Sequence, residues 1–495
     1  MYNLMLKENT KESLYHMDQV KDNCGFGLMV NRHGVTSRKV VIGSISGLNS
    51  MTHRGAIGSD GKTGDGCGLL FDLNKRFFKK AVKREVNIDL PDNFGIAQIF
   101  SSYPLKRDFD KIRSILQSEG LVFFCSRQVP IDKSILGEIA LNSLPFINQI
   151  FIIFAKDFNK EQFESSLLQA RKKIEEIYDN DEKLYVCSMS CQTIVYKGLM
   201  LPDAISKFYI DLSKKSFTAK ICLFHQRFST NTQPRWHLAQ PFRLLAHNGE
   251  INAIRGNRNW VKARLSKFST PLIPNITRFK SLVNETGSDS SALDNMIELL
   301  IKGGINFFRS IRMVLPPAWQ NIHTMDPEIR AFHEYNSMHM EAWDGPAGIV
   351  MSDGQWAICV LDRNGLRPAR YQVLTDGIIT IGSETGIYPV ADDQILQKGR
   401  LSPGGIFAVN TESGEIFDQN SIDNELKQNK PYRDWLKKSA IYLESTLDSF
   451  EGPSIKKIPY SDLIKASKLF SLFGEERVSI IKPLAIDGVE GTGSM

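Results

Sequence analysis

The sequence predicts a mixed α and β fold that runs as one continuous unit over most of the chain. Short runs of β-branched and aromatic residues alternate with amphipathic helical segments from residue 26 to about residue 417. No repeat of fixed period, low-complexity segment or linker interrupts this stretch. With 495 residues, of which 42% are hydrophobic and 23% charged, the chain has enough apolar sequence to bury a large core.

The first predicted elements are a strand at 26–30 and a helix that follows it. Apolar residues recur at helical spacing from Val40 to Met51, so we expect this helix to end near His53. Glycines then stand at positions 55, 58, 61, 64, 66 and 68. So many glycines disfavour a helix and suit tight turns, or backbone that approaches a ligand closely.

Inside this glycine-rich stretch, Gly61-Lys62-Thr63 is similar to the end of a phosphate-binding loop. Such a loop has a glycine five positions earlier, where this chain has Ala56, and a helix afterwards, where it has Gly64-Asp65-Gly66. The pattern therefore does not predict nucleotide binding.

The remaining elements alternate along the chain. Predicted strands cover 96–103, 121–125, 149–155, 184–196 and 219–226, and predicted helices cover 108–119 and 161–178. The helix at 161–178 is the clearest, because Phe163, Leu167 and Ile174 form one apolar stripe. A charge-rich stretch at 418–460 is interpreted as a domain boundary.

Composition excludes several classes of function. The net charge of +6 is small and the basic residues are scattered, so no nucleic-acid surface is predicted. No apolar run reaches 18 residues, and the polar first 23 residues lack the apolar core of a secretory signal. Seven cysteines, odd in number and widely spread, favour a reducing compartment, here the cytoplasm. The lone Cys187-x3-Cys191 pair is weak support for a metal site.

The candidate nucleophile is Cys24 in the sequence Asp22-Asn23-Cys24-Gly25-Phe26-Gly27. If residues 1–23 were removed as a leader, Cys24 would carry a thiol and a free α-amine. The amine has an ordinary pKa of about 7.7–8.0 and the thiol about 8.5, so the amine can take the thiol proton near neutral pH. The alternative is that Cys24 is a small buried hydrophobic residue.

Three polar clusters follow predicted strands or open a predicted helix. In His225–Thr232, Arg227 at a strand end suits a bidentate grip on a carboxylate, or else a structural ion pair. In His247–Ile251, a strand is expected to turn directly into a helix, where Asn248 and the Gly249 N–H could hold an oxyanion; the alternative is a plain turn. In Gly287–Ser291, Asp289 opens a helix, either as a cap or as a partner for a substrate ammonium group. Together they suit an amino acid with a side-chain amide.

The same segments resemble a known family. Short motifs resemble the class II glutamine amidotransferases, which are N-terminal-nucleophile hydrolases: Cys24–Gly27, His53–Gly55, His225–Asn231, Asn248–Glu250 and Ser288–Ser290. Longer ones resemble the large subunits of bacterial-type glutamate synthases: Thr63–Gly68, Pro234–Trp236, Pro316–Gln320, Trp343–Gly348 and Leu361–Pro368. The resemblance runs from about residue 22 to the end of the chain.

This resemblance implies an α+β fold, a four-layer αββα sandwich with two antiparallel sheets between helical layers. It implies that Cys24 is the nucleophile and its freed α-amine the base, with Asn248 and Gly249 as the oxyanion hole. Arg227 would hold the α-carboxylate of L-glutamine and Asp289 its α-ammonium group. The domains would be a leader at 1–23, the amidotransferase domain at 24–417, and a linker with the beginning of a truncated central domain at 418–495.

The resemblance also implies what the rest of such a protein does. Ammonia would pass to 2-oxoglutarate to form a second glutamate, with FMN and an iron–sulfur cluster bound outside this segment. Electrons would come from NADPH through a small subunit, or from ferredoxin. Two rival hypotheses stay open: a catalytically silent fragment that acts as a binding or assembly module, and another class II amidotransferase, such as one that feeds a sugar phosphate.

Overall fold

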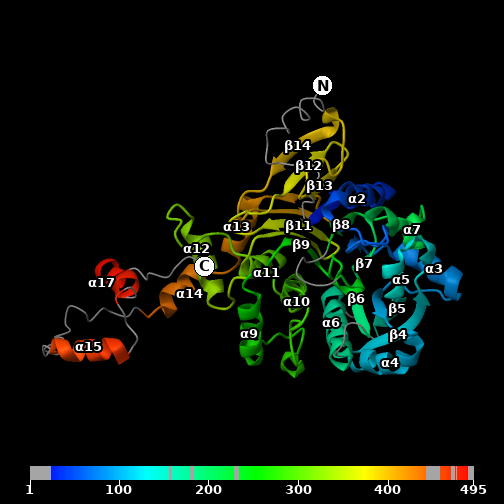
Figure 1. The fold of residues 1–495 in the computed structure, drawn as a ribbon. Coiled ribbons are helices and arrows are strands. Elements are labelled where there is room, and N and C mark those ends of the chain that lie inside the picture. Colours follow the sequence, from blue (N-terminus) through cyan, green and yellow to red (C-terminus); the bar gives the residue numbers. More distant parts are fainter. Residues whose placement is uncertain are drawn as a thin grey trace. The chain divides into compact units, whose positions relative to one another are not determined.

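A computed structural model of the chain describes residues 24–154, 159–178, 183–227, 234–441, 458–469, 474 and 477–488. It divides into two compact units, Met1–Lys438 and Ser439–Met495. All strands of the described residues belong to the first unit (Figure 1). None of the helices in these ranges is both long and apolar enough to span a membrane.

The strands of the first unit form three antiparallel sheets. The 7-stranded sheet has the order β14-β12-β13-β1-β8-β2-β7, the 5-stranded sheet β16-β15-β11-β10-β9 and the 4-stranded sheet β4-β5-β3-β6. The strands are β1 (Gly25–Asn31), β2 (Cys67–Asp72), β3 (Phe94–Ser101), β4 (Leu121–Gln128), β5 (Phe146–Phe154), β6 (Leu184–Ser190), β7 (Thr193–Gly198), β8 (Ile221–Gln226), β9 (Leu245–Gly249), β10 (Ala347–Ser352), β11 (Trp356–Leu361), β12 (Arg370–Leu374), β13 (Ile378–Gly382), β14 (Ile395–Arg400), β15 (Ile406–Asn410) and β16 (Ile416–Phe417).

The α-helices lie between and around these strands. They are α2 (Arg38–Ser50), α3 (Lys75–Val86), α4 (Phe109–Ser118), α5 (Glu138–Asn142), α6 (Lys160–Ile177), α7 (Ile205–Phe208), α8 (Ile210–Ser213), α9 (Ile254–Arg264), α10 (Asp289–Lys302), α11 (Phe307–Val314), α12 (Pro327–Ser337), α13 (Gln419–Asn429) and α14 (Tyr432–Ser439). The second unit has α15 (Tyr460–Leu469), a π-helix (Arg477–Ile481) and α17 (Lys482–Asp487).

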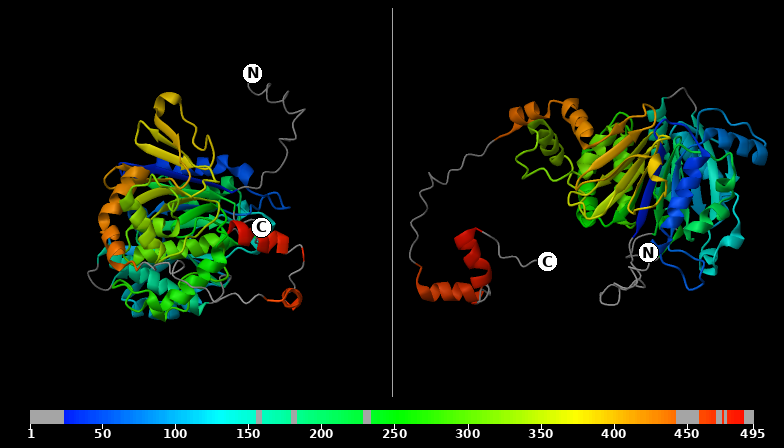
Figure 2. Two further views of the ribbon diagram at one scale, coloured as in Figure 1. Left: turned by 90° about the vertical axis from the view of Figure 1, so that its left-hand side faces the viewer. Right: turned by 90° about the horizontal axis from the view of Figure 1, so that it is seen from above.

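The two larger sheets lie face to face and form the centre of the first unit (Figure 2). Their shared core is apolar, and includes Phe26 and Leu28 of β1 and Val350 of β10. On the outer side of the 7-stranded sheet, α2 packs against β1 and β8, and α10 covers the outer side of the 5-stranded sheet. The order helix, sheet, sheet, helix confirms the αββα layering of an α+β fold.

The strand β1 occupies the middle of its sheet, paired with β8 on one side and β13 on the other. Phe26 points into the core between the sheets. At Gly27, a Cβ would lie 2.2 Å from ring atoms of Phe224, so no side chain fits there. Both neighbours and both faces of β1 are therefore closely packed.

A third sheet extends the sandwich beside the 7-stranded sheet. Its core packs against α4 and α6. The prediction of a single strand at 184–196 is wrong. Two separate strands, β6 of this sheet and β7 of the 7-stranded sheet, are joined at Cys191 and Gln192. The Ser190 hydroxyl accepts the N–H of Gln192 at 2.9 Å, which stabilises this tight turn.

The ends of two predicted segments also differ from the structure. The helix α2 stops at Ser50, and a 3₁₀ turn at Thr52–Arg54 follows it before the glycine-rich loop. The first compact unit extends to Lys438, beyond the expected boundary at 417. Apolar residues of α13 and α14, namely Ile422, Leu426 and Tyr432, are buried in the core beneath the 5-stranded sheet, which ties these helices to the unit.

Candidate active site

Cys24 lies directly before β1, at the end of the central strand of the 7-stranded sheet. Its side chain is half-buried. Burial raises the pKa of the Cys24 thiol to about 11, an effect that Asp65 adds to and that Arg227 and Arg367 oppose. The thiol is therefore protonated near neutral pH, and a base is needed to make it a nucleophile.

The side chain of Asn248 reaches Cys24 from the opposite sheet. Its Nδ2 donates a hydrogen bond to the backbone oxygen of Cys24 at 2.7 Å, and the Asn248 side chain is buried. The structure thus brings together two predicted residues that stand 224 positions apart. An amide N–H at this place is suited to meet an oxygen bound beside the thiol.

Gly249 follows at the end of β9, in a backbone conformation with φ of 131°. A Cβ on this residue would lie 1.7 Å from the carbonyl oxygen of Pro346, so only glycine fits. The helix expected directly after these residues begins only at Ile254. If Asn248 and Gly249 form an oxyanion hole, it therefore lies at the end of a strand, and no helix N-terminus contributes to it.

Arg227 follows β8 and faces the same region. Its backbone N–H donates to Gly66 O at 2.8 Å, and its Nε lies 3.3 Å from Asp65 Oδ2. Its φ of 76° is in the left-handed region, which costs a residue with a Cβ about 1–2 kcal/mol. Contacts with the glycine-rich loop thus hold this guanidinium in place, whereas Phe228–Thr232 of its cluster lie outside the described residues.

Asp289 is the first residue of α10, and Ser288 is the N-cap: the Ser288 hydroxyl accepts the N–H of Ser291. The Asp289 carboxylate accepts the backbone N–H of Ile251 at 2.7 Å and the Ser290 hydroxyl at 3.1 Å. This carboxylate is therefore fixed beside the strand that carries Asn248 and Gly249, and it remains partly exposed. Such an arrangement suits a partner for an ammonium group.

Two charged residues near Cys24 were not predicted as site residues. Asp65 pairs with Arg227, and both Asp65 and Arg367 act on the pKa of the Cys24 thiol. Asp65 is in the glycine-rich loop between Gly64 and Gly66, a position that offers a sequence signal, since glycines allow close approach of backbone. Arg367 lies in the motif Leu361–Pro368, two residues after Gly365, and offers a similar signal.

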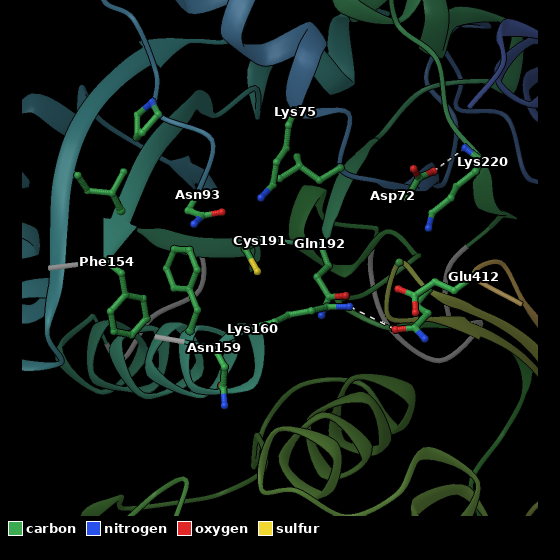
Figure 3. A pocket seen from close by; sticks show the side chains of 16 residues that line it. Asp72, Lys75, Asn93, Phe154, Asn159, Lys160, Cys191, Gln192, Lys220 and Glu412 are labelled. Atoms are coloured by element: carbon green, nitrogen blue, oxygen red, sulfur yellow. Dashed lines mark hydrogen bonds between the residues drawn. The ribbon is translucent and has the colours of Figure 1, made fainter. Parts of the chain in front are cut away.

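A spacious cavity lies elsewhere. It has a volume of about 780 Å³ and, as Figure 3 shows, its lining includes Asp72, Lys75, Lys160, Lys220 and Glu412; we call it the lysine cavity. Asp72 ends β2 and Lys220 precedes β8, whereas Asp65 precedes β2 and Arg227 follows β8. The lysine cavity is therefore at the end of these strands opposite Cys24, and it contains none of the predicted site residues. Among the described residues, no group of three or more His, Cys, Asp or Glu side chains could hold a metal ion.

The chain matches a known protein family. Residues 24–435 match the family described as class II glutamine amidotransferases. This match covers well over half of the chain, and the chain belongs to that family.

Individual relatives are more specific. The chain is 36% identical to the glutamate synthase [NADPH] large chain of Azospirillum brasilense and 37% identical to that of Bacillus subtilis, over 98% and 100% of its length. It is 33% identical, over 95% of its length, to ferredoxin-dependent glutamate synthase 1 of Arabidopsis thaliana. The chain spans 32%, 32% and 30% of the lengths of these three relatives.

A solved structure of glutamine phosphoribosylpyrophosphate amidotransferase from B. subtilis is a remote neighbour. It is 16% identical with a TM-score of 0.28, over 66% of this chain and 48% of that one. A likeness at this level carries no argument about function.

Proposed function

We propose that residues 24–435 hydrolyse the side-chain amide of L-glutamine to glutamate and ammonia through a γ-glutamyl thioester on Cys24. The observation that carries this proposal is the 2.7 Å hydrogen bond from Asn248 to Cys24 in a chain of the class II amidotransferase family. Arg227 and Asp289, fixed in place by their neighbours, supply the two opposite charges that an amino acid needs.

In this mechanism the leader at residues 1–23 is first removed, which frees the α-amine of Cys24. The amine takes the thiol proton, and the sulfur attacks the amide carbon of glutamine. Asn248 Nδ2 and the Gly249 N–H stabilise the oxyanion. The C–N bond then breaks, and the protonated α-amine of Cys24 returns its proton to the leaving nitrogen. Water then hydrolyses the thioester. Throughout, Arg227 holds the α-carboxylate and Asp289 the α-ammonium group of the substrate.

We further propose that this activity serves glutamate synthesis in the cytoplasm. Ammonia would react with 2-oxoglutarate in a part of the whole protein that these residues do not include, and FMN and an iron–sulfur cluster would be bound there. The relatives include both NADPH and ferredoxin types, at 36% and 33% identity, so both electron donors remain candidates. Residues 1–23 are proposed as the leader, and residues 439–495, which follow the first compact unit, as the linker and the beginning of the central domain.

The test is ammonia release from L-glutamine by the purified chain, with intact mass to identify its first residue. Chain that begins at Cys24 should release ammonia and glutamate in equal amounts, and Cys24→Ala should lose at least about 10⁴-fold in kcat. Unchanged activity in Cys24→Ala would refute the proposal. If chain that begins at Cys24 is inactive, the silent binding or assembly module becomes the better hypothesis.

A further inference from the structure

One chain of hydrogen bonds connects the three polar clusters that surround the candidate site. His225 of β8 lies with its Nε2 3.0 Å from the backbone oxygen of His247 of β9. His247 Nδ1 lies 3.1 Å from the Ser290 hydroxyl of α10, and that hydroxyl lies 3.1 Å from the Asp289 carboxylate. The chain therefore crosses from one large sheet to the other and continues to the helix behind it.

The members of this chain are deeply buried. His225, His247 and Ser290 are 0%, 1% and 2% exposed. Burial lowers the pKa of His225 to about 3, and burial also lowers the pKa of His247 below its usual value although Asp289 raises it. Both imidazoles are therefore neutral near pH 7, and each carries one N–H.

The partners decide which nitrogen carries the proton. A backbone oxygen can only accept, so His225 donates from Nε2. A carboxylate also only accepts, so Ser290 donates its hydroxyl proton to Asp289. His247 must then donate to the Ser290 oxygen from Nδ1. His247 Nε2 is left as a bare acceptor, and among the described residues it has no hydrogen-bond partner.

We propose that this chain, with His247 at its centre, is a positioning network for the glutaminase site. His247 adjoins Asn248, Ser290 adjoins Asp289, and His225 stands two residues before Arg227. The N–H of His247 directs the Ser290 hydroxyl to Asp289 and thereby fixes the carboxylate that binds the substrate ammonium group. The proposal rests on the proposed function and adds three residues that touch no substrate.

The first experiment uses paired substitutions that keep one ring nitrogen or the other. An asparagine side-chain nitrogen stands near the place of Nδ1, and a glutamine nitrogen near that of Nε2. His247→Asn should keep KM for glutamine within about twofold of the unsubstituted chain. His247→Gln should raise KM about tenfold, because the Ser290 hydroxyl is then no longer directed toward Asp289. At His225, where Nε2 donates, His225→Gln should keep KM for glutamine close to that of the unsubstituted chain, and His225→Asn should raise it.

A role in packing alone predicts a different pattern, because glutamine is closer in size to histidine at both positions. Equal KM values for the Asn and Gln variants at position 247, or a better Gln variant, would overturn the proposal. Peptide-level measurement of Cys24 alkylation by iodoacetamide, a reagent without ammonium or carboxylate groups, should give equal rates in all four variants.

The second experiment needs no variant and no enzyme activity. In ¹⁵N-histidine-labelled chain, nuclear magnetic resonance should show His225 as the Nε2–H tautomer and His247 as the Nδ1–H tautomer. An Nε2–H tautomer at His247 would refute the network. A chain without glutaminase activity would instead refute the proposed function, and the tautomers would still decide whether the network exists.

Discussion

The two ends of the central strands differ in how their polar groups are held. At the Cys24 end, polar groups of distant segments are joined: the Asn248 amide to the backbone oxygen of Cys24, Asp65 to Arg227, and His247 to the Ser290 hydroxyl. At the other end, the lysine cavity is spacious, but Lys75 and Lys160 bond singly to Asp92 O and Gln355, and Asp72 to backbone N–H groups. The spacious cavity is therefore not at the end that holds the proposed catalytic residues, and that end is distinguished instead by polar groups that hold one another in place.

The largest expected effect is at the Cys24 end. Asn248→Ala removes the amide that donates to Cys24, and we expect kcat for glutamine to fall about 10²- to 10³-fold, as for loss of an oxyanion-hole donor. Steady-state ammonia release measures this, and the melting temperature checks that the variant is folded. A fall of less than about threefold would remove Asn248 from the oxyanion hole.

The next effect concerns the contact between the glycine-rich loop and Arg227. Asp65→Asn removes the charge paired with Arg227, so we expect KM for glutamine to rise about tenfold. The same change removes a charge that raises the pKa of the Cys24 thiol, so alkylation of Cys24 at pH 8 should become faster. Slower alkylation would show that Asp65 does not act on the thiol through its charge. Asp203→Asn, on an exposed carboxylate, is the control.

At the cavity end we expect an effect on stability. Burial raises the pKa of Asp72 to about 6, and an unfolded aspartate titrates near about 3.9. The folded chain therefore binds the additional proton between these values, and the free energy of unfolding falls as pH rises from 4 to 6. Asp72→Asn keeps an oxygen for the N–H groups of Lys220 and Ile221 and should stabilise the chain by about 1–3 kcal/mol at pH 7.

Urea unfolding at pH 4 and pH 7 measures this effect. The gain from Asp72→Asn should be larger at pH 7, and glutaminase activity should not change. A gain that is equal at the two pH values would contradict a raised pKa for Asp72.

The smallest expected effect is also at the cavity end. The triple variant Lys75→Gln, Lys160→Gln and Lys220→Gln removes the positive charges of the lysine cavity. We expect kcat and KM for glutamine to stay within about twofold, because the lysine cavity lies at the opposite end of the central strands and salt screens charges at long range. A tenfold change would mean that the two ends are coupled and would weaken the contrast between them.

Local pattern predicted many elements. The stripe of Phe163, Leu167 and Ile174 indicated a helix at 161–178, and α6 covers Lys160–Ile177. The turn between β6 and β7 was missed because every residue of both strands is buried. Polar and apolar residues alternate from Cys187 to Gln192, across the turn itself, so the periodicity shows no break there.

The site was predictable only in part. The motif around Cys24 indicated a nucleophile, but its contact with Asn248 joins segments that no local pattern relates, and the family resemblance supplied that link. Asp65 and Arg367 were missed because charged residues in loops are normally solvated. Their effect on Cys24 depends on how the loops fold back onto β1 and β8.

The packing of β1 also fixes the position of Cys24, the proposed nucleophile. Phe26 fills the core between the sheets while Gly27 lies against the Phe224 ring, so a shift of one residue along the ladder would put a phenyl ring where no side chain fits. An inserted or deleted residue in β1 therefore cannot be absorbed by sliding the strand. The distance from the thiol to the amide of Asn248 is thus set by the order of two residues, Phe26 and Gly27, that take no part in the proposed chemistry.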